Sequence, residues 1–169
     1  MNLNSLSTVI ELFREDMKFS AAHFTIFSET QRECLHGHNF QVYAIITAPV
    51  IGNNLSFDYT ICRKEILNLC YSLNERCLMP SKSPYLKIEK QHRCYMIKFD
   101  KTKFVLPEED VLLLPIKNIT TEGLAQWFVK TIASNKDFYG LEDAEILTIK
   151  IATAPGQYAS ATVLLKEFN

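Results

Sequence analysis

Apolar and polar residues alternate in two neighbouring segments near the start of the chain. The first is MKFSAAH, and the second is HGHNFQVYAII, which continues into β-branched and aromatic residues that favour strands. The polar stretch 28–33 between them is typical of a connection, so we predict a hairpin. Side chains two residues apart share a strand face. One face therefore carries Met17, Phe19, Ala21 and His23 in the first strand, and His36, His38, Phe40, Val42 and Ala44 in the second.

Two later segments have helical periodicity. Asp58 is a suitable N-cap for a helix that ends near SLNERCLMP, and either Thr120 or Thr121 can cap a second helix, with Glu122 at the positive end of its dipole. The apolar stripes of the two helices are Cys62, Ile66, Leu69, Cys70 and Leu73, and Leu124, Ala125, Phe128, Val129 and Ile132.

A second hairpin is predicted at the end of the chain, from EILTIKIAT and QYASATVLLKEF with a turn around Pro155 and Gly156. Between the helices, the segment from Pro80 to Pro115 contains the strand-like runs RCYMIKF and KFVLP, which we interpret as an inserted hairpin. The expected fold class is therefore α+β, with a four-stranded antiparallel sheet, two helices on one face and the insertion at about 80–115. One domain is expected to span residues 1–169.

Composition narrows the classes of partner. The 169 residues are 47% apolar and 22% charged, which is typical of a soluble globular domain. Eighteen basic and nineteen acidic residues without a basic run argue against binding to nucleic acid or an anionic membrane. Five cysteines without a CxxC spacing are expected to be reduced thiols, and no export signal is recognised at the start of the chain. We therefore expect a cytoplasmic protein with small-molecule partners.

Three of the four histidines lie on the predicted shared face, namely His23, His36 and His38. Three neutral imidazoles around one ion leave a coordination position open, as in catalytic zinc sites. The alternative is that His36 and His38 are half-exposed strand residues without a ligand role. His23 favours the metal, because an unpaired buried imidazole is costly. The fourth histidine, His92, is expected on the surface.

Five segments, FSAAH, LHGHNF, SFDY, LNERCL and TTEGLA, resemble in order the signature of the 6-pyruvoyltetrahydropterin synthase and 6-carboxytetrahydropterin synthase family. The resemblance implies the tunnelling fold, in which sheets join into an oligomeric barrel, usually a homohexamer built as a dimer of trimers. It also implies catalytic zinc on His23, His36 and His38. Members of this family are lyases that act on 7,8-dihydroneopterin triphosphate, on the way to biopterin, folate or queuosine.

Two departures from the family pattern concern catalysis. Most members carry a cysteine base further upstream of HGH than any cysteine here, so Glu33 or Cys34 would have to serve. Glu33 is our candidate base, since a family branch with glutamate in this stretch is associated with side-chain cleavage; the alternative is a solvated loop glutamate. The usual Asp-His pair is replaced by Asn74-Glu75, where Glu75 acts alone or is only a surface residue at the helix end. Arg32, close to the ligands in sequence, is expected to be solvated.

A third departure concerns the substrate. Relatives place a ring-binding glutamate in the final hairpin, where this chain has Thr153. Thr120, Thr121 and Glu122 match a second pterin-contacting segment, although helix capping explains them equally well. The leading hypothesis is a zinc-dependent carbon–oxygen or carbon–carbon lyase of pterins. The alternatives are the same zinc site acting on a different heterocyclic or phosphorylated substrate, and a catalytically silent pterin-binding homologue.

Overall fold

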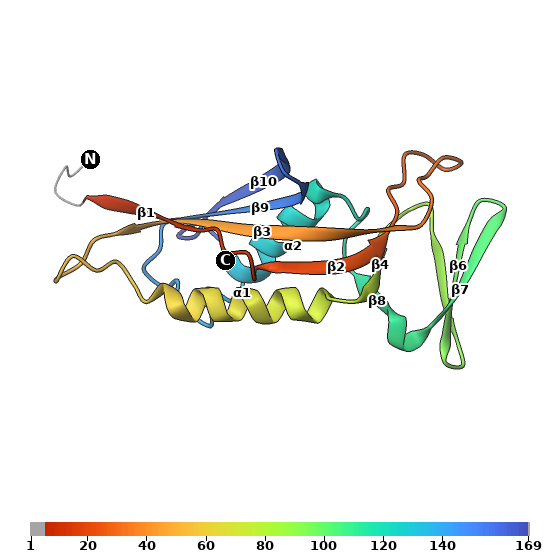
Figure 1. Cartoon of the computed structure of the whole chain (residues 1–169), viewed down its shortest axis with the longest axis horizontal. Coiled ribbons are helices and arrows are strands. Elements are labelled where there is room, and N and C mark those ends of the chain that lie inside the picture. Colours follow the sequence, from red (N-terminus) through yellow and green to blue (C-terminus); the bar gives the residue numbers. More distant parts are fainter. Residues whose placement is uncertain (1–5, 169) are drawn as a thin grey trace.

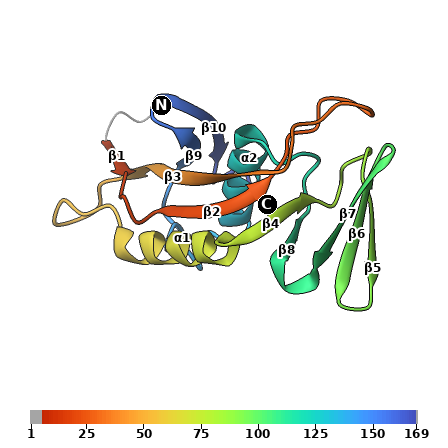
Figure 2. The same cartoon turned by 45° about the vertical axis from the view of Figure 1, so that its right-hand side comes forward.

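The structure, a computed structural model, describes residues 6–168. A large sheet forms its centre, two helices pack against that sheet, and a smaller sheet lies at one end (Figures 1 and 2). In chain order the elements are β1 Ser7–Leu12, β2 Lys18–His23, β3 His36–Pro49, α1 Tyr59–Leu73, β4 Arg76–Pro80, β5 Lys87–Gln91, β6 Cys94–Phe99, β7 Thr102–Pro107, the short 3₁₀ helix Glu108–Asp110, β8 Val111–Leu114, α2 Thr121–Ala133, β9 Ile146–Ala154 and β10 Gln157–Leu164.

The four predicted strands of the main sheet are confirmed as β2, β3, β9 and β10, and all three of their contacts are antiparallel. Three further strands extend this sheet, giving the order β10-β9-β3-β2-β4-β8 with β1 paired to the second half of β3. β4 and β8 join in parallel. Apart from Arg76, their sequences RCLMP and VLLL are continuous apolar runs, and such runs lack the alternation that identifies a strand.

Both helices begin as the sequence predicts. Asp58 accepts a hydrogen bond from the backbone N–H of Thr60 at 2.9 Å, and Thr120 Oγ1 accepts one from that of Gly123 at 3.1 Å. α1 lies against β2, whereas α2 lies against β9 and β10 (Figure 1). Their apolar stripes join the inner face of the sheet in one hydrophobic cluster, whose largest fully buried members include Phe19, Phe40, Phe128, Ile66 and Leu73.

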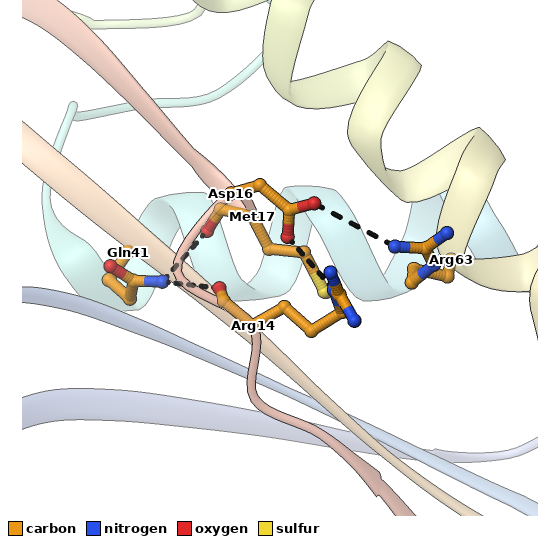
Figure 3. Close-up of polar contacts among 5 residues, drawn as sticks. All are labelled: Arg14, Asp16, Met17, Gln41 and Arg63. Carbon is orange, nitrogen blue, oxygen red and sulfur yellow. Dashed lines mark hydrogen bonds and ion pairs between the residues drawn. The ribbon is translucent and has the colours of Figure 1, made fainter.

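The connection between β1 and β2 is attached both to the sheet and to α1 (Figure 3). Asp16 accepts from Arg14 Nε at 3.3 Å and forms an ion pair of 3.7 Å with Arg63 of α1. On the sheet side, Gln41 Nε2 donates to the carbonyl groups of Arg14 and Met17 at 2.8 and 3.3 Å. These contacts attach the segment just before β2 to both α1 and β3.

The inserted segment is larger than the predicted hairpin. Its predicted runs form β6 and β7, and β5 adds a third antiparallel strand (Figure 2). The sequence KIEKQ of β5 is mostly polar, which explains why no strand was predicted there. The small sheet contributes to a second hydrophobic cluster with residues from β4, β8 and the β2–β3 connection, consisting of Phe24, Ile26, Cys77, Met79, Ile97, Phe99 and Val111.

Cys62 and Cys70 lie in the core, as predicted from the helical period. Burial raises the pKa of each thiol to about 12, so neither is a nucleophile at neutral pH. Neither helix among residues 6–168 combines the length and apolar character needed to cross a membrane.

Candidate metal centre and active site

The three predicted ligands converge at one end of the β2–β3 ladder. His23 is the last residue of β2 and His36 the first of β3, and the two are direct cross-strand partners. His38 is two residues further along β3 and shares their face. One ring nitrogen from each histidine lies within 4.8 Å of the other two. His36 Nε2 and His38 Nε2 are 3.0 Å apart. The hairpin therefore gathers three imidazoles around one point.

Backbone carbonyl groups orient two of the rings. His23 Nδ1 is 2.8 Å from the oxygen of Ile119, and His36 Nδ1 is 2.8 Å from the oxygen of Cys34. A carbonyl only accepts, so each Nδ1 must carry the proton and each Nε2 presents a lone pair. His23 Nε2 is buried and has no hydrogen-bond partner within residues 6–168. A buried nitrogen in this state is costly without a partner, and a bound metal ion would supply one.

The donor set fits zinc. Zinc binds imidazole nitrogen at about 2.0–2.1 Å, so two such nitrogens around a tetrahedral ion lie roughly 3.3 Å apart, close to the observed spacing of His36 and His38. Burial is the main cause that lowers the pKa of His23, and the neighbouring histidines lower it further. The neutral form of His23, which is the form that binds metal, is therefore favoured.

Glu33 lies beside this cluster in the connection between β2 and β3. Its carboxylate accepts a hydrogen bond from the backbone N–H of Thr25 at 3.0 Å, and its own N–H donates to the Thr25 carbonyl at 2.9 Å. Burial acts to raise the pKa of Glu33, but the Thr25 hydrogen bonds and the charges of His36 and His23 together hold it below the ordinary glutamate value. Glu33 is therefore ionised at neutral pH.

Glu33 and two of the histidines face a pocket of about 280 Å³. The four residues predicted to contact the substrate also line this pocket, namely Thr120, Thr121, Glu122 and Thr153. They come from β9 and the start of α2, which are remote in sequence from β2. The first turn of α2 contributes Glu122, whose pKa is lowered by its own backbone N–H and by the Thr120 and Thr121 hydroxyls. The lining residues are His23, Thr25, Phe27, Glu33, His38, Phe40, Thr120, Thr121, Glu122 and Thr153.

Two candidate catalytic residues lie outside this pocket. Cys34 is exposed and does not line the pocket, and its carbonyl group accepts from His36 Nδ1. Glu75 follows the C-cap of α1 with a φ of 58° and lines a separate pocket of about 540 Å³, which His38 also lines. Its neighbour Asn74 accepts from the backbone N–H of Ser20 at 2.8 Å, which joins the helix end to β2. Within one chain, Glu75 and Glu33 therefore do not share a pocket.

Sequence reasoning missed the residues that hold the site together. The Asn118 side chain accepts from the N–H of Ile26 at 3.0 Å and donates to its carbonyl at 2.8 Å. The next residue, Ile119, supplies the carbonyl that orients His23. Asn118 lies two residues before the N-cap of α2, outside any segment with strand or helix periodicity, so the sequence pattern does not indicate its role. A larger pocket of about 650 Å³ runs along α2 beside Asn118, but it contains no histidine.

Comparison with known proteins agrees with this architecture. The structure matches the 6-pyruvoyl tetrahydropterin synthase of Plasmodium falciparum with a TM-score of 0.88 and 26% identity, covering 95% of this chain and 99% of that one. The Plasmodium vivax enzyme matches with a TM-score of 0.87 and 22% identity, over 94% and 99%. A protein of Methanocaldococcus jannaschii, provisionally named 6-carboxy-5,6,7,8-tetrahydropterin synthase, is 26% identical over 144 residues, covering 85% of this chain and 88% of the relative.

The family model described as 6-pyruvoyl tetrahydropterin synthase matches residues 12–163. This range includes every strand and helix from β2 to β9 and nearly all of β10. This membership supports a tetrahydropterin synthase-like function, and the resemblance seen in the sequence is confirmed. The chain belongs to the 6-pyruvoyl tetrahydropterin synthase family.

Proposed function

We propose that this protein is a zinc-dependent lyase that acts on 7,8-dihydroneopterin triphosphate or a related dihydropterin. The observation that carries the proposal is the convergence of three imidazoles on one point, two of which line a pocket together with an ionised carboxylate and several threonines. The imidazoles match a catalytic zinc site with an open position. The carboxylate matches a general base within reach of a bound substrate.

Each residue has a defined task in this reaction. His23, His36 and His38 would hold the zinc, which when bound polarises the oxygens of the substrate side chain and stabilises developing negative charge. Glu33 takes a proton from the carbon next to such an oxygen, and its Thr25 hydrogen bond keeps the carboxylate aimed into the pocket. The hydroxyls of Thr120, Thr121 and Thr153, with the Glu122 carboxylate, hydrogen-bond the ring and its substituents.

Glu33 is a better candidate base than Cys34. The carboxylate of Glu33 lines the pocket, whereas Cys34 is exposed and does not. A glutamate is also described as the catalytic residue of the Plasmodium vivax enzyme, in structures where alanine or cysteine replaces it. Glu75 would assist only from another copy of the chain, because it faces a different pocket within its own. This arrangement is compatible with the oligomeric barrel, a homohexamer, that we propose for the assembly.

Mass spectrometry of the products tests the proposal. Zinc-loaded protein is incubated with 7,8-dihydroneopterin triphosphate, and free tripolyphosphate and 6-substituted pterins are the diagnostic ions. We expect a new pterin whose mass identifies either elimination or side-chain cleavage. Unchanged substrate despite full zinc loading would contradict the lyase and favour the catalytically silent homologue.

One observation favours a second candidate, in which the zinc site acts on a different heterocyclic or phosphorylated compound. Thr153 offers the pocket a single hydroxyl at the wall formed by β9. One hydroxyl cannot make the paired charge-assisted hydrogen bonds of a carboxylate. A substrate-depletion screen that includes other heterocycles and phosphate esters separates this candidate from the first.

Replacing Thr153 with valine should raise KM for the dihydropterin about fivefold and leave kcat unchanged. The change removes one hydroxyl at nearly constant volume, and a hydrogen bond of this kind contributes about 1 kcal/mol. Steady-state kinetics measures the effect. Thr148→Val in the same strand is the matched control, because the Thr148 hydroxyl bonds to Thr162 at 2.8 Å and does not line the pocket. Equal KM values for the Thr153 variant and the unchanged protein would remove Thr153 from substrate binding.

A further inference from the structure

Arg32 lies among three aromatic rings. The central carbon of its guanidinium group is 4.7 Å from the ring centroid of Phe104, 5.1 Å from that of Phe24 and 5.7 Å from that of Phe99. These distances are within the roughly 6 Å range of cation–π attraction. Arg32 Nε is buried without a hydrogen-bond partner among the described residues. The prediction that Arg32 is a solvated loop residue is therefore wrong, because long-range packing covers it.

The rings come from two separate parts of the chain. Phe24 directly follows β2, whereas Phe99 ends β6 and Phe104 belongs to β7. Figures 1 and 2 both show the β2–β3 connection at the same end of the molecule as the inserted sheet. Phe24 and Phe99 also share the second hydrophobic cluster, against which Phe104 packs. The insertion therefore supplies two of the three rings around Arg32.

The same arginine is joined to Glu33. Arg32 Nη1 donates to the carbonyl oxygen of Glu33 at 2.6 Å. The backbone of Arg32 also forms an antiparallel bridge with Ile26, next to the two hydrogen bonds that join Glu33 to Thr25. The carbonyl, the N–H and the carboxylate of Glu33 are thus all hydrogen-bonded. The guanidinium group of Arg32 donates to the carbonyl, and Thr25 bonds the other two groups. Displacing Arg32 would free the segment that carries the carboxylate.

We propose that Arg32 is a positioning residue, which the rings of the inserted sheet hold in place so that it fixes the Glu33 carboxylate beside the histidine cluster. The inference rests on the proposed function, in which Glu33 is the base. A planar guanidinium group can stack against rings while one of its nitrogens donates to a carbonyl, and a lysine ammonium cannot do both in this geometry. A base displaced by about 1 Å can lose on the order of a hundredfold in rate.

The variants Arg32→Lys and Phe104→Leu test this role. For both we expect unchanged zinc content, a KM within about twofold of the original, and a kcat reduced about tenfold or more. A second measurement needs no substrate: hydrogen exchange at the amides of Thr25 and Glu33 should accelerate about tenfold, while exchange in β9 stays the same. Arg93→Lys is the matched control, because Arg93 is exposed between β5 and β6.

Unchanged exchange at Thr25 and Glu33 in both variants would overturn the positioning role. Faster exchange that extends equally to β9 would also overturn it, because it would indicate general destabilisation. If the unaltered protein does not turn over any dihydropterin, the proposed function fails by itself, and the exchange measurement still decides whether Arg32 orders the Glu33 segment.

Discussion

Replacing His36 with alanine is expected to remove zinc from the protein. The imidazole of His36 supplies the nitrogen that lies 3.0 Å from that of His38, and without it only two of the three ligands remain. Removing a residue that only hydrogen-bonds a metal ligand typically weakens metal binding by about 10- to 100-fold. Removing a ligand itself should therefore weaken it by more than about a hundredfold. Zinc content by elemental analysis, and the increase in Tm on adding zinc, both measure this effect.

His92→Ala is the control for that experiment. His92 is exposed in the turn between β5 and β6 and is not one of the three clustered histidines, so the substitution should change neither zinc content nor Tm. Full zinc occupancy in the His36 variant would show that the three imidazoles do not form the metal site. Loss of zinc in both variants would point to an effect of histidine removal unrelated to this cluster.

Replacing Glu33 with glutamine is expected to lower kcat roughly a hundredfold or more, which corresponds to about 2.7 kcal/mol in the activation free energy. The glutamine oxygen can still accept from the backbone N–H of Thr25, so the loop should keep its conformation. Only the ability to accept a proton from the substrate is lost. Zinc content and KM should therefore change little, and steady-state kinetics with elemental analysis distinguishes this pattern from loss of the site.

The matched control is Glu29→Gln, because Glu29 is exposed in the same connection and does not line the pocket. A normal rate for the Glu33 variant would exclude Glu33 as the base, and Cys34 would then be examined by Cys34→Ser. A similar decrease in both glutamine variants would indicate a general electrostatic effect of the loop.

The histidine face could be predicted because strand alternation is a local property. Side chains two residues apart point the same way, so His23, His36 and His38 needed only a correct strand assignment and a hairpin. The prediction that Thr153 and the start of α2 both contact the substrate followed from the family resemblance. Neither argument depends on detailed packing.

Other parts of the site depend on contacts between distant segments. Asn118 binds the backbone of Ile26 across 92 positions in the sequence, and no local pattern indicates such a contact. The rings around Arg32 come partly from an insertion whose placement depends on the packing of its own apolar face. β4 and β8 were missed because a short apolar run fits a strand or a buried helix equally well.

The cross-strand pairing of His23 with His36 has a consequence for the lifetime of the protein. These two residues close the base of the connection 24–35, so an ion bound across them would tether both ends of that segment. By thermodynamic linkage, a ligand present at about 100 times its Kd adds about 2.7 kcal/mol to the stability of the state that binds it. If the proposed zinc site is filled, loss of the metal would leave a chain whose 24–35 segment opens more often, and chains in such open states are degraded faster.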